Sequence, residues 1–295
     1  MKLLLPLDVM HSYNSQLLQT RRLLPLKDVD IVILYVYENG KQHEGILKKL
    51  GKSASELDDQ VNSQAHKMLE EVAKELRPLC NTVSLQVLSG NAAQVIATTA
   101  EKEKCDLIVV KSTDSASANT YLLGSTATNV VKHSTCPVLI LRTSDTSAQE
   151  IKRVVIGVDG SASALKAIKT FAKQFKAASR SIEISLVHVV SISGIWRFIS
   201  PVEFIAAVED NLDMAAQMIL AEADKALADS GLKPADLIVK SGDPAQELMK
   251  TAEDLKANLI VVGAQGKVAL DKFSIGGVSN KLSLHSQLPT LIVNN

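Results

Sequence analysis

The sequence predicts an α/β protein made of two doubly wound domains, each built around a parallel sheet, and three observations support this fold class. Residues 90–140 align without a gap with residues 242–292, so the second half of the 295-residue chain repeats the first. Each half alternates strand-like and helix-like segments, as α/β domains do. Several strand-like segments are unbroken runs of leucine and β-branched residues, which indicates parallel strands covered by helices on both faces.

The repeat also sets the expected domain boundaries. Among the matched positions are Gly124 with Gly276 and His133 with His285. We expect a first domain over residues 1–143, a polar linker over residues 144–150 and a second domain over residues 151–295. This length suits two domains of ordinary size.

Each half is expected to hold five strands. They cover residues 2–7, 30–36, 83–88, 107–110 and 137–141 in the first half, and residues 152–158, 182–190, 235–239, 259–262 and 289–293 in the second. Long helices are expected over residues 53–76, 161–178 and 203–228. Asn91 and Asp243 stand at N-cap positions, and Pro244 takes a first helical position.

The composition excludes several classes of protein. Lysine and arginine balance aspartate and glutamate at 32 each, which argues against a general nucleic-acid or anionic-membrane binder. No apolar run approaches the roughly 20 residues of a membrane span, and the short apolar start is interrupted by Asp8. Cys80, Cys105 and Cys136 show no metal-binding spacing and are expected to be reduced structural thiols. A cytoplasmic location is therefore expected.

A ligand site is expected where the sheet winding reverses, beyond the carboxyl ends of the strands. Asp8 and Asp159 end the first strand of each half. In the second half, a loop bounded by Gly263, Gly266 and Gly276 follows the fourth strand. Glycines allow close approach to backbone amides, and a helix N-terminus attracts anions. These features together predict a triphosphate site.

At this point the chain resembles the universal stress protein family in its tandem form. The resemblance rests on four motifs in a fixed order. They are Val-Val-Ile-Gly-Val-Asp159-Gly-Ser, Asn258-Leu-Ile-Val-Val-Gly263, the G-x2-G-x9-G spacing of Gly263, Gly266 and Gly276, and Cys136-Pro137-Val-Leu-Ile. The resemblance implies five-stranded domains of strand order 3-2-1-4-5, of the adenine nucleotide alpha hydrolase-like type. It also implies pairing of the fifth strands about a pseudo-twofold axis, and in some members ATP binding with a divalent cation such as Mg²⁺.

The resemblance also implies which residues would hold ATP. In the second domain Asp159 would meet the ribose or adenine side, and the backbone of Val189 the adenine. The phosphates would lie against Gly263, Gly266, Gly276 and Gly277, with Ser279 nearby. The counterparts in the first domain are Pro6, Asp8, Val36, Gly124 and Ser125.

Neither copy matches the family pattern completely. Gly277 stands where a serine or threonine would add a hydroxyl, and Lys111 and Asp114 replace the two loop glycines in the first half. Because a carboxylate repels a triphosphate, we expect the first domain not to bind ATP in the family's way. It would then be a structural partner or hold a different ligand.

Several of these residues also have purely structural explanations. Asp159 could cap the following helix, and Gly263 and Gly266 could serve only as turn residues. His188, inside an apolar strand, is expected to be a hydrogen-bonded core residue, and His133 and His285 are expected to favour helix C-termini. The segment 191–207, which holds the only tryptophan, Trp196, could be a lid, a dimer contact, an apolar pocket or ordinary packing.

The last strand of each half is short and apolar, and a bare edge of this kind invites pairing. We therefore expect residues 137–141 to pair with residues 289–293, although a helix could cover each edge instead, and a homodimer is possible.

No nucleophile elbow, Walker loop or zinc-protease motif occurs. The expected function is non-enzymatic ATP binding in a stress response, through the second domain, with at most slow incidental hydrolysis. The alternatives are a nucleotide-free interaction scaffold or a binder of another small ligand.

Overall fold

The computed structural model describes residues 1–8, 13–38, 53–112, 124–142, 150–175, 181–191, 202–266 and 275–294, with side chains of the helix that begins at Val202 described from residue 211. These residues form two compact units, one from each half of the chain. The expected linker lies outside the described residues except for Glu150, and residues 192–201 of the Trp196 segment also lie outside them.

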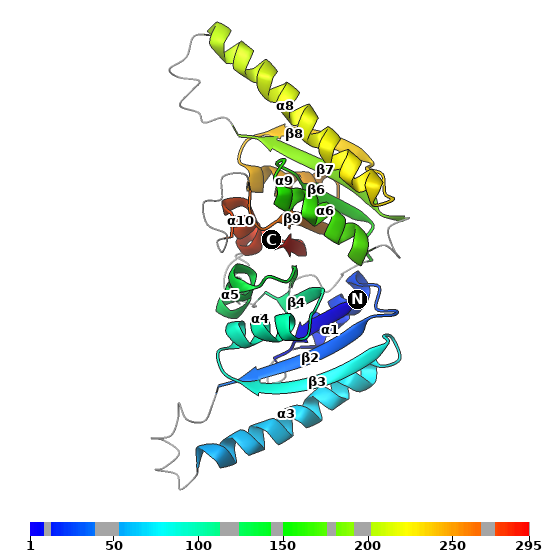
Figure 1. Cartoon of the computed structure of the whole chain (residues 1–295), viewed down its shortest axis with the longest axis vertical. Coiled ribbons are helices and arrows are strands. Elements are labelled where there is room, and N and C mark those ends of the chain that lie inside the picture. Colours follow the sequence, from blue (N-terminus) through cyan, green and yellow to red (C-terminus); the bar gives the residue numbers. More distant parts are fainter. Residues whose placement is uncertain are drawn as a thin grey trace. The chain divides into compact units, whose positions relative to one another are not determined.

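The first unit is a parallel five-stranded sheet with helices (Figure 1). Its elements in chain order are β1 (Lys2–Pro6), α1 (Asn14–Leu23), β2 (Asp30–Tyr37), α3 (Ala54–Leu76), β3 (Thr82–Ser89), α4 (Ala92–Lys102), β4 (Leu107–Lys111), α5 (Ser125–His133) and β5 (Val138–Leu141). The strand order is β3-β2-β1-β4-β5, and every pair of neighbouring strands runs parallel. In Figure 1, α3 runs beside β3, against which it packs.

The second unit repeats this topology. Its elements are β6 (Arg153–Gly157), α6 (Ala162–Gln174), β7 (Glu183–Val190), α8 (Val202–Asp229), β8 (Asp236–Ser241), α9 (Pro244–Asp254), β9 (Leu259–Gly263), α10 (Gly277–His285) and β10 (Thr290–Val293). The order β8-β7-β6-β9-β10 is again 3-2-1-4-5 in the numbering of a single domain. The predicted fold class is thus confirmed, with all ten strands at the expected places.

The cores are aliphatic, and the central strands carry them. In β1 and β6, Leu3–Leu5 and Val154–Ile156 are at most 1 % exposed, and β5 and β10 are buried along their whole length. Continuous burial of this kind matches the unbroken apolar runs of the sequence.

Local sequence signals explain most helix starts. The side chains of Asn91 and Asp243 accept hydrogen bonds from the backbone N–H groups of Gln94 and Gln246, both at 3.1 Å, as expected of N-caps. Ser53 and Glu56 form a reciprocal capping box at the start of α3. By contrast, α5 and α10 begin after Gly124 and Gly276, and no described side chain caps either helix.

Candidate functional site

In the second unit the winding reverses at β6, which pairs with β7 on one side and β9 on the other. Ligands of open α/β sheets bind beyond the carboxyl ends of the strands at this switch point. Asp159 follows β6, and Gly263 is the last residue of β9. The sequence-predicted residues therefore emerge from the two strands that flank the switch point.

The structure brings Asp159 and Gly266 into contact. A Cβ atom added to Gly266 would lie 2.8 Å from Oδ2 of Asp159, so a larger residue here would push the Asp159 side chain aside. Oδ1 of Asp159 accepts a hydrogen bond of 3.0 Å from the N–H of Ser161. The N-cap of α6 is Ser161 itself, whose hydroxyl accepts from Ala164 N–H at 3.1 Å. Asp159 is thus not the helix cap, and one of its oxygens lies against the glycine turn.

Gly263 has a packing role. A Cβ atom there would lie 2.6 Å from the carbonyl carbon of Ser163, in the first turn of α6. Glycine therefore lets the start of α6 approach the end of β9 closely. Its assignment to phosphate contact stays a prediction, and this geometry shows a sufficient structural reason for the residue.

The turn after β9 is locked onto the start of α10. The N–H of Gly276 donates a 2.6 Å hydrogen bond to the carbonyl of Ala264. The Ser279 hydroxyl lies 2.9 Å from the carbonyl oxygens of both Gly263 and Ala264, and Ser279 is only 2 % exposed. This hydroxyl therefore holds the turn in place, and its predicted role beside a phosphate would be indirect.

The N-terminus of α10 is suited to an anion. The first backbone N–H groups of a helix have no partner within it, and they carry the positive end of the helix dipole. Among the described residues, no side chain caps this helix, and a Cβ atom at Gly277 would meet no atom within 4 Å. A phosphate at a helix N-terminus of this kind is a common arrangement.

His188 is a residue at this edge for which the sequence reasoning predicted only a core role. Its Nδ1 is 2.8 Å from the carbonyl oxygen of Val158, the residue before Asp159. Because that partner is a carbonyl, Nδ1 carries the hydrogen. The ring is half-buried, next in the strand to Val189, whose backbone was predicted to meet adenine. Its place beside Val189, at the carboxyl end of the second strand, is the signal that could have marked it.

The first unit has the corresponding residues in a different setting. Pro6 ends β1, Asp8 follows it, Val36 lies in β2, and Gly124 and Ser125 begin α5. Lys111 ends β4, at the place that Gly263 takes in β9. Asp114 lies outside the described residues.

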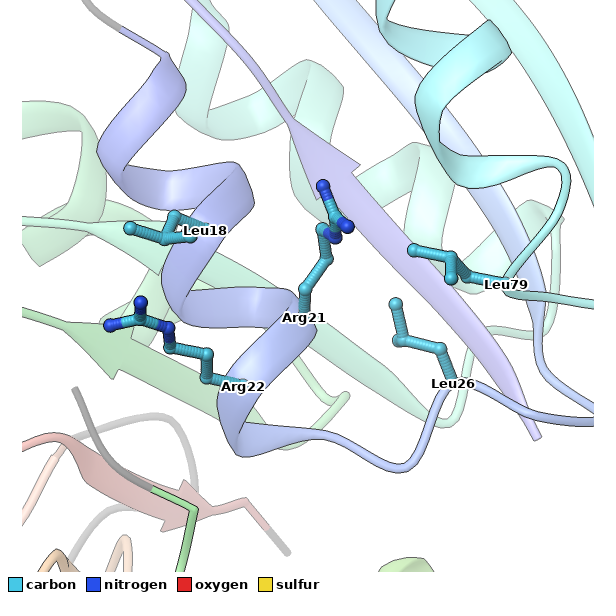
Figure 2. Close-up of a pocket in the computed structure, with 5 residues that line it drawn as sticks. All are labelled: Leu18, Arg21, Arg22, Leu26 and Leu79. Atoms are coloured by element: carbon cyan, nitrogen blue, oxygen red, sulfur yellow. The ribbon is translucent and has the colours of Figure 1, made fainter.

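Two pockets elsewhere in the described residues are separate from this edge. One, of about 400 Å³, lies in the first unit between α1 and the segments that precede β2 and β3 (Figure 2). Its lining combines three leucines with two arginines: Leu18, Leu26, Leu79, Arg21 and Arg22. The other, of about 340 Å³, lies at the amino ends of β6 and β7, where Arg153 pairs with Glu183 at 2.8 Å. Both pockets lie near the amino ends of strands of their own unit, whereas the predicted site lies beyond the carboxyl ends of strands.

Two further properties bear on the kind of site. Within the described ranges, no three histidine, cysteine or acidic side chains gather as metal ligands. Among the helices described, none is long and apolar enough to cross a membrane.

The protein is a tandem doubly wound α/β protein. It has two parallel five-stranded sheets of strand order 3-2-1-4-5, and in each of them a helix that begins after a glycine follows the fourth strand. The sequence pattern of the universal stress protein family matches residues 3–142 and again residues 150–294. The chain therefore belongs to the universal stress protein family, with two copies of its domain.

Known relatives agree with this assignment. Universal stress protein YxiE of Bacillus subtilis is 31 % identical over 145 residues, which cover 48 % of this chain and 97 % of the relative. Universal stress protein MJ0531 of Methanocaldococcus jannaschii is 31 % identical over 153 residues, covering 48 % of this chain and 81 % of the relative. The crystal structure of a universal stress protein from Archaeoglobus fulgidus covers 99 % of this chain and 98 % of its own, with a TM-score of 0.69 at 18 % identity. That last likeness shows the fold of the whole chain.

Proposed function

We propose that the protein is a non-enzymatic nucleotide-binding module of a stress response, and that its second domain binds ATP, with Mg²⁺ where the triphosphate requires it. The observation that carries this proposal is the uncapped start of α10, where the first turn of the helix, from Gly277 on, presents backbone N–H groups beside the Gly263–Gly266 turn. The Gly276 N–H instead holds that turn through its bond to Ala264. Such a helix start stabilises a phosphate through hydrogen bonds and the helix dipole.

Asp159 and the neighbouring strand end would hold the nucleoside part. A carboxylate at the carboxyl ends of the strands of a doubly wound sheet can accept hydrogen bonds from ribose hydroxyls. The half-buried Val189 and His188 would lie on the adenine side of the site. The described residues supply binding groups here, and we assign none of them a catalytic role.

The site should be tested by calorimetric titration of the full chain with Mg-ATP. We expect one site per chain, because the first domain lacks the loop glycines. Gly277→Asp is the diagnostic variant, since it places a carboxylate beside the amides that would meet the phosphates, and we expect at least tenfold weaker binding. Lys281→Gln, farther along α10, is a control that should bind normally.

Other outcomes would change the assignment. If the wild-type chain gives no heat and releases no nucleotide in native mass spectrometry, the nucleotide-free scaffold becomes the better explanation. Two equivalent sites per chain would contradict the assignment to the second domain. The cytoplasmic location, a possible homodimer and the pairing of terminal strands stay predictions.

A further inference from the structure

The first helices of the two units present different chemistry to their sheets. Their N-caps are Tyr13 and Ser161, so Gln16 of α1 corresponds to Ala164 of α6. On the same inner face, Gln19 corresponds to Ala167 and Thr20 to Ile168. All six of these residues are buried, and the difference is therefore a polar against an apolar helix face at equivalent places.

The Gln16 amide joins the two strands of the switch point in the first unit. Its Nε2 donates to the carbonyl of Pro6, at the end of β1, at 2.9 Å, and to the carbonyl of Val109, in β4, at 3.1 Å. A side-chain amide has two N–H donors, and these two acceptors use both. Gln16 is only 5 % exposed, so the amide is enclosed between α1 and the strand ends.

The hydrogen-bonded pairing between β1 and β4 ends near the Gln16 amide, earlier than the corresponding pairing in the second unit. Between β1 and β4, Leu3 pairs with Leu107 and Leu4 pairs with Ile108. Between β6 and β9 the pairing continues for one more residue pair, Ile156 with Val261. The strands of the first unit thus separate where Val109 begins to accept from Gln16. In the first unit the Gln16 amide thus connects the two strands at a place where the corresponding strands of the second unit pair directly.

The end of the fourth strand differs in step with the helix. In the second unit Gly263 allows the backbone of Ser163 to come close, and Ala164, the counterpart of Gln16, is buried. In the first unit Lys111 has a side chain where Gly263 has none. A Cβ atom at this position is incompatible with the close approach seen in the second unit. In the first unit the Gln16 amide instead reaches the carbonyls of both strands.

We propose that Gln16 is the residue that closes the switch point of the first domain: its amide bridges β1 and β4 and fills the crevice to which the second domain would admit a nucleotide. The role of the crevice as a nucleotide site rests on the function proposed above. The bridge itself rests only on the contacts of Gln16. The first domain is then a copy whose switch point is occupied by its own side chain.

The bridge is tested directly by NMR of the full-length protein, without nucleotide. With the side-chain amides labelled, the Gln16 NH₂ hydrogens should exchange with water at least tenfold more slowly than those of an exposed glutamine. Gln16→Glu, which replaces the NH₂ group with an oxygen that faces two carbonyls, should lower the thermal unfolding midpoint. Gln16→Met, of similar length and without a donor, should have a smaller effect. Rapid exchange of the Gln16 amide would overturn the bridge even if no variant folds.

Closure is tested by moving the side chain into the second domain. Ala164→Gln should weaken Mg-ATP binding at least tenfold, whereas Lys166→Gln, which adds a glutamine on the exposed side of the same helix, should leave it unchanged. Unaltered binding by Ala164→Gln would overturn the proposal that a glutamine here closes the crevice. If wild type itself binds no nucleotide, the proposed function fails, while the NMR measurement still decides the bridge.

Discussion

At the residue scale, four glycines of the second domain have different surroundings, although the sequence pattern gives them the same predicted role. Gly263 lies against the backbone of α6, Gly266 against the carboxylate of Asp159, and Gly276 against the carbonyl of Ala264. Gly277 differs from the other three, because a Cβ atom there would meet none of the described residues within 4 Å. A spacing pattern predicts that all four matter, but the contacts of each decide whether it serves packing or leaves room for a ligand.

This difference predicts opposite effects of adding one methyl group. Gly263→Ala should lower the free energy of unfolding by about 1–3 kcal/mol, because α6 must move away from β9. Gly277→Ala should leave stability unchanged or raise it by up to about 1 kcal/mol, since alanine favours the helix. Urea unfolding of both variants measures the effect. Equal destabilisation by the two substitutions would show that the close contact at Gly263 is unimportant.

The three cysteines are expected to be poorly reactive in the folded chain. Burial raises the pKa of Cys105 to about 11 and that of Cys136 to about 12, and it also raises the pKa of the less buried Cys80. Because the thiolate is the reactive form, native alkylation by iodoacetamide at pH 8 should be slowest at Cys136 and fastest at Cys80. Peptide mass spectrometry measures the three rates, which should become similar in urea. Fastest labelling at Cys136 would contradict this order.

The raised pKa values of these cysteines also make the stability of the fold depend on pH in a definite direction. A folded-state pKa above the unfolded value means that the neutral thiol is the favoured form in the fold. The contribution is therefore complete below the unfolded pKa, near 8.5. It is lost as the pH rises toward about 11 and 12.

At the element scale, α9 offers a test of a cap that the sequence predicted correctly. Asp243 accepts from Gln246 N–H at 3.1 Å and pairs with Lys281 at 2.7 Å, and these contacts, the Lys281 hydrogen bond first, lower the pKa of its carboxyl. Asp243→Ala should cost about 1 kcal/mol of unfolding free energy through loss of the cap. Asp243→Asn should cost less, because an amide oxygen still caps the helix, as Asn91 does in α4.

The pH dependence separates the two contributions of Asp243. A lowered folded-state pKa means that the charge-dependent stability is present above the unfolded pKa and is lost as the pH falls through the folded value, below 3.8. The stability difference between wild type and Asp243→Asn should therefore shrink when urea unfolding is repeated at acid pH. A difference that stays constant with pH would assign the effect to geometry alone.

Elements with strong local signals were predictable, whereas the contacts between them were not. The strand runs, the caps at Asn91 and Asp243 and the helix starts after Gly124 and Gly276 all follow from side-chain chemistry within a few residues. The bridge made by Gln16 depends on Val109, 93 residues later in the chain, and on how far α1 stands from β4. The periodicity of the sequence does not encode the distance between a helix and a strand. A glutamine near a helix start does not by itself predict that its amide has buried partners.

At the scale of the whole molecule, duplication has produced two domains with the same topology and different switch points. Strand order and the uncapped glycine-led helix are retained in both. The first helix and the end of the fourth strand have diverged together, with Gln16 and Lys111 in one copy and Ala164 and Gly263 in the other. Retained topology shows that both copies must fold. These differences at the ligand edge agree with the proposal that only the second domain binds a nucleotide.

Hydrogen exchange with and without Mg-ATP compares the two copies within a single sample. We expect slower exchange at the first amides of α10, Gly277–Ser279, and no change at the matching start of α5. At nucleotide concentrations 100-fold above Kd, binding adds about 2.7 kcal/mol to opening reactions that release the nucleotide, which corresponds to roughly 100-fold slower exchange. The start of α9 is an internal control, because Asp243 already caps its amides. Protection at α5 equal to that at α10 would mean that the first domain also binds, and that its polar first helix does not exclude a nucleotide.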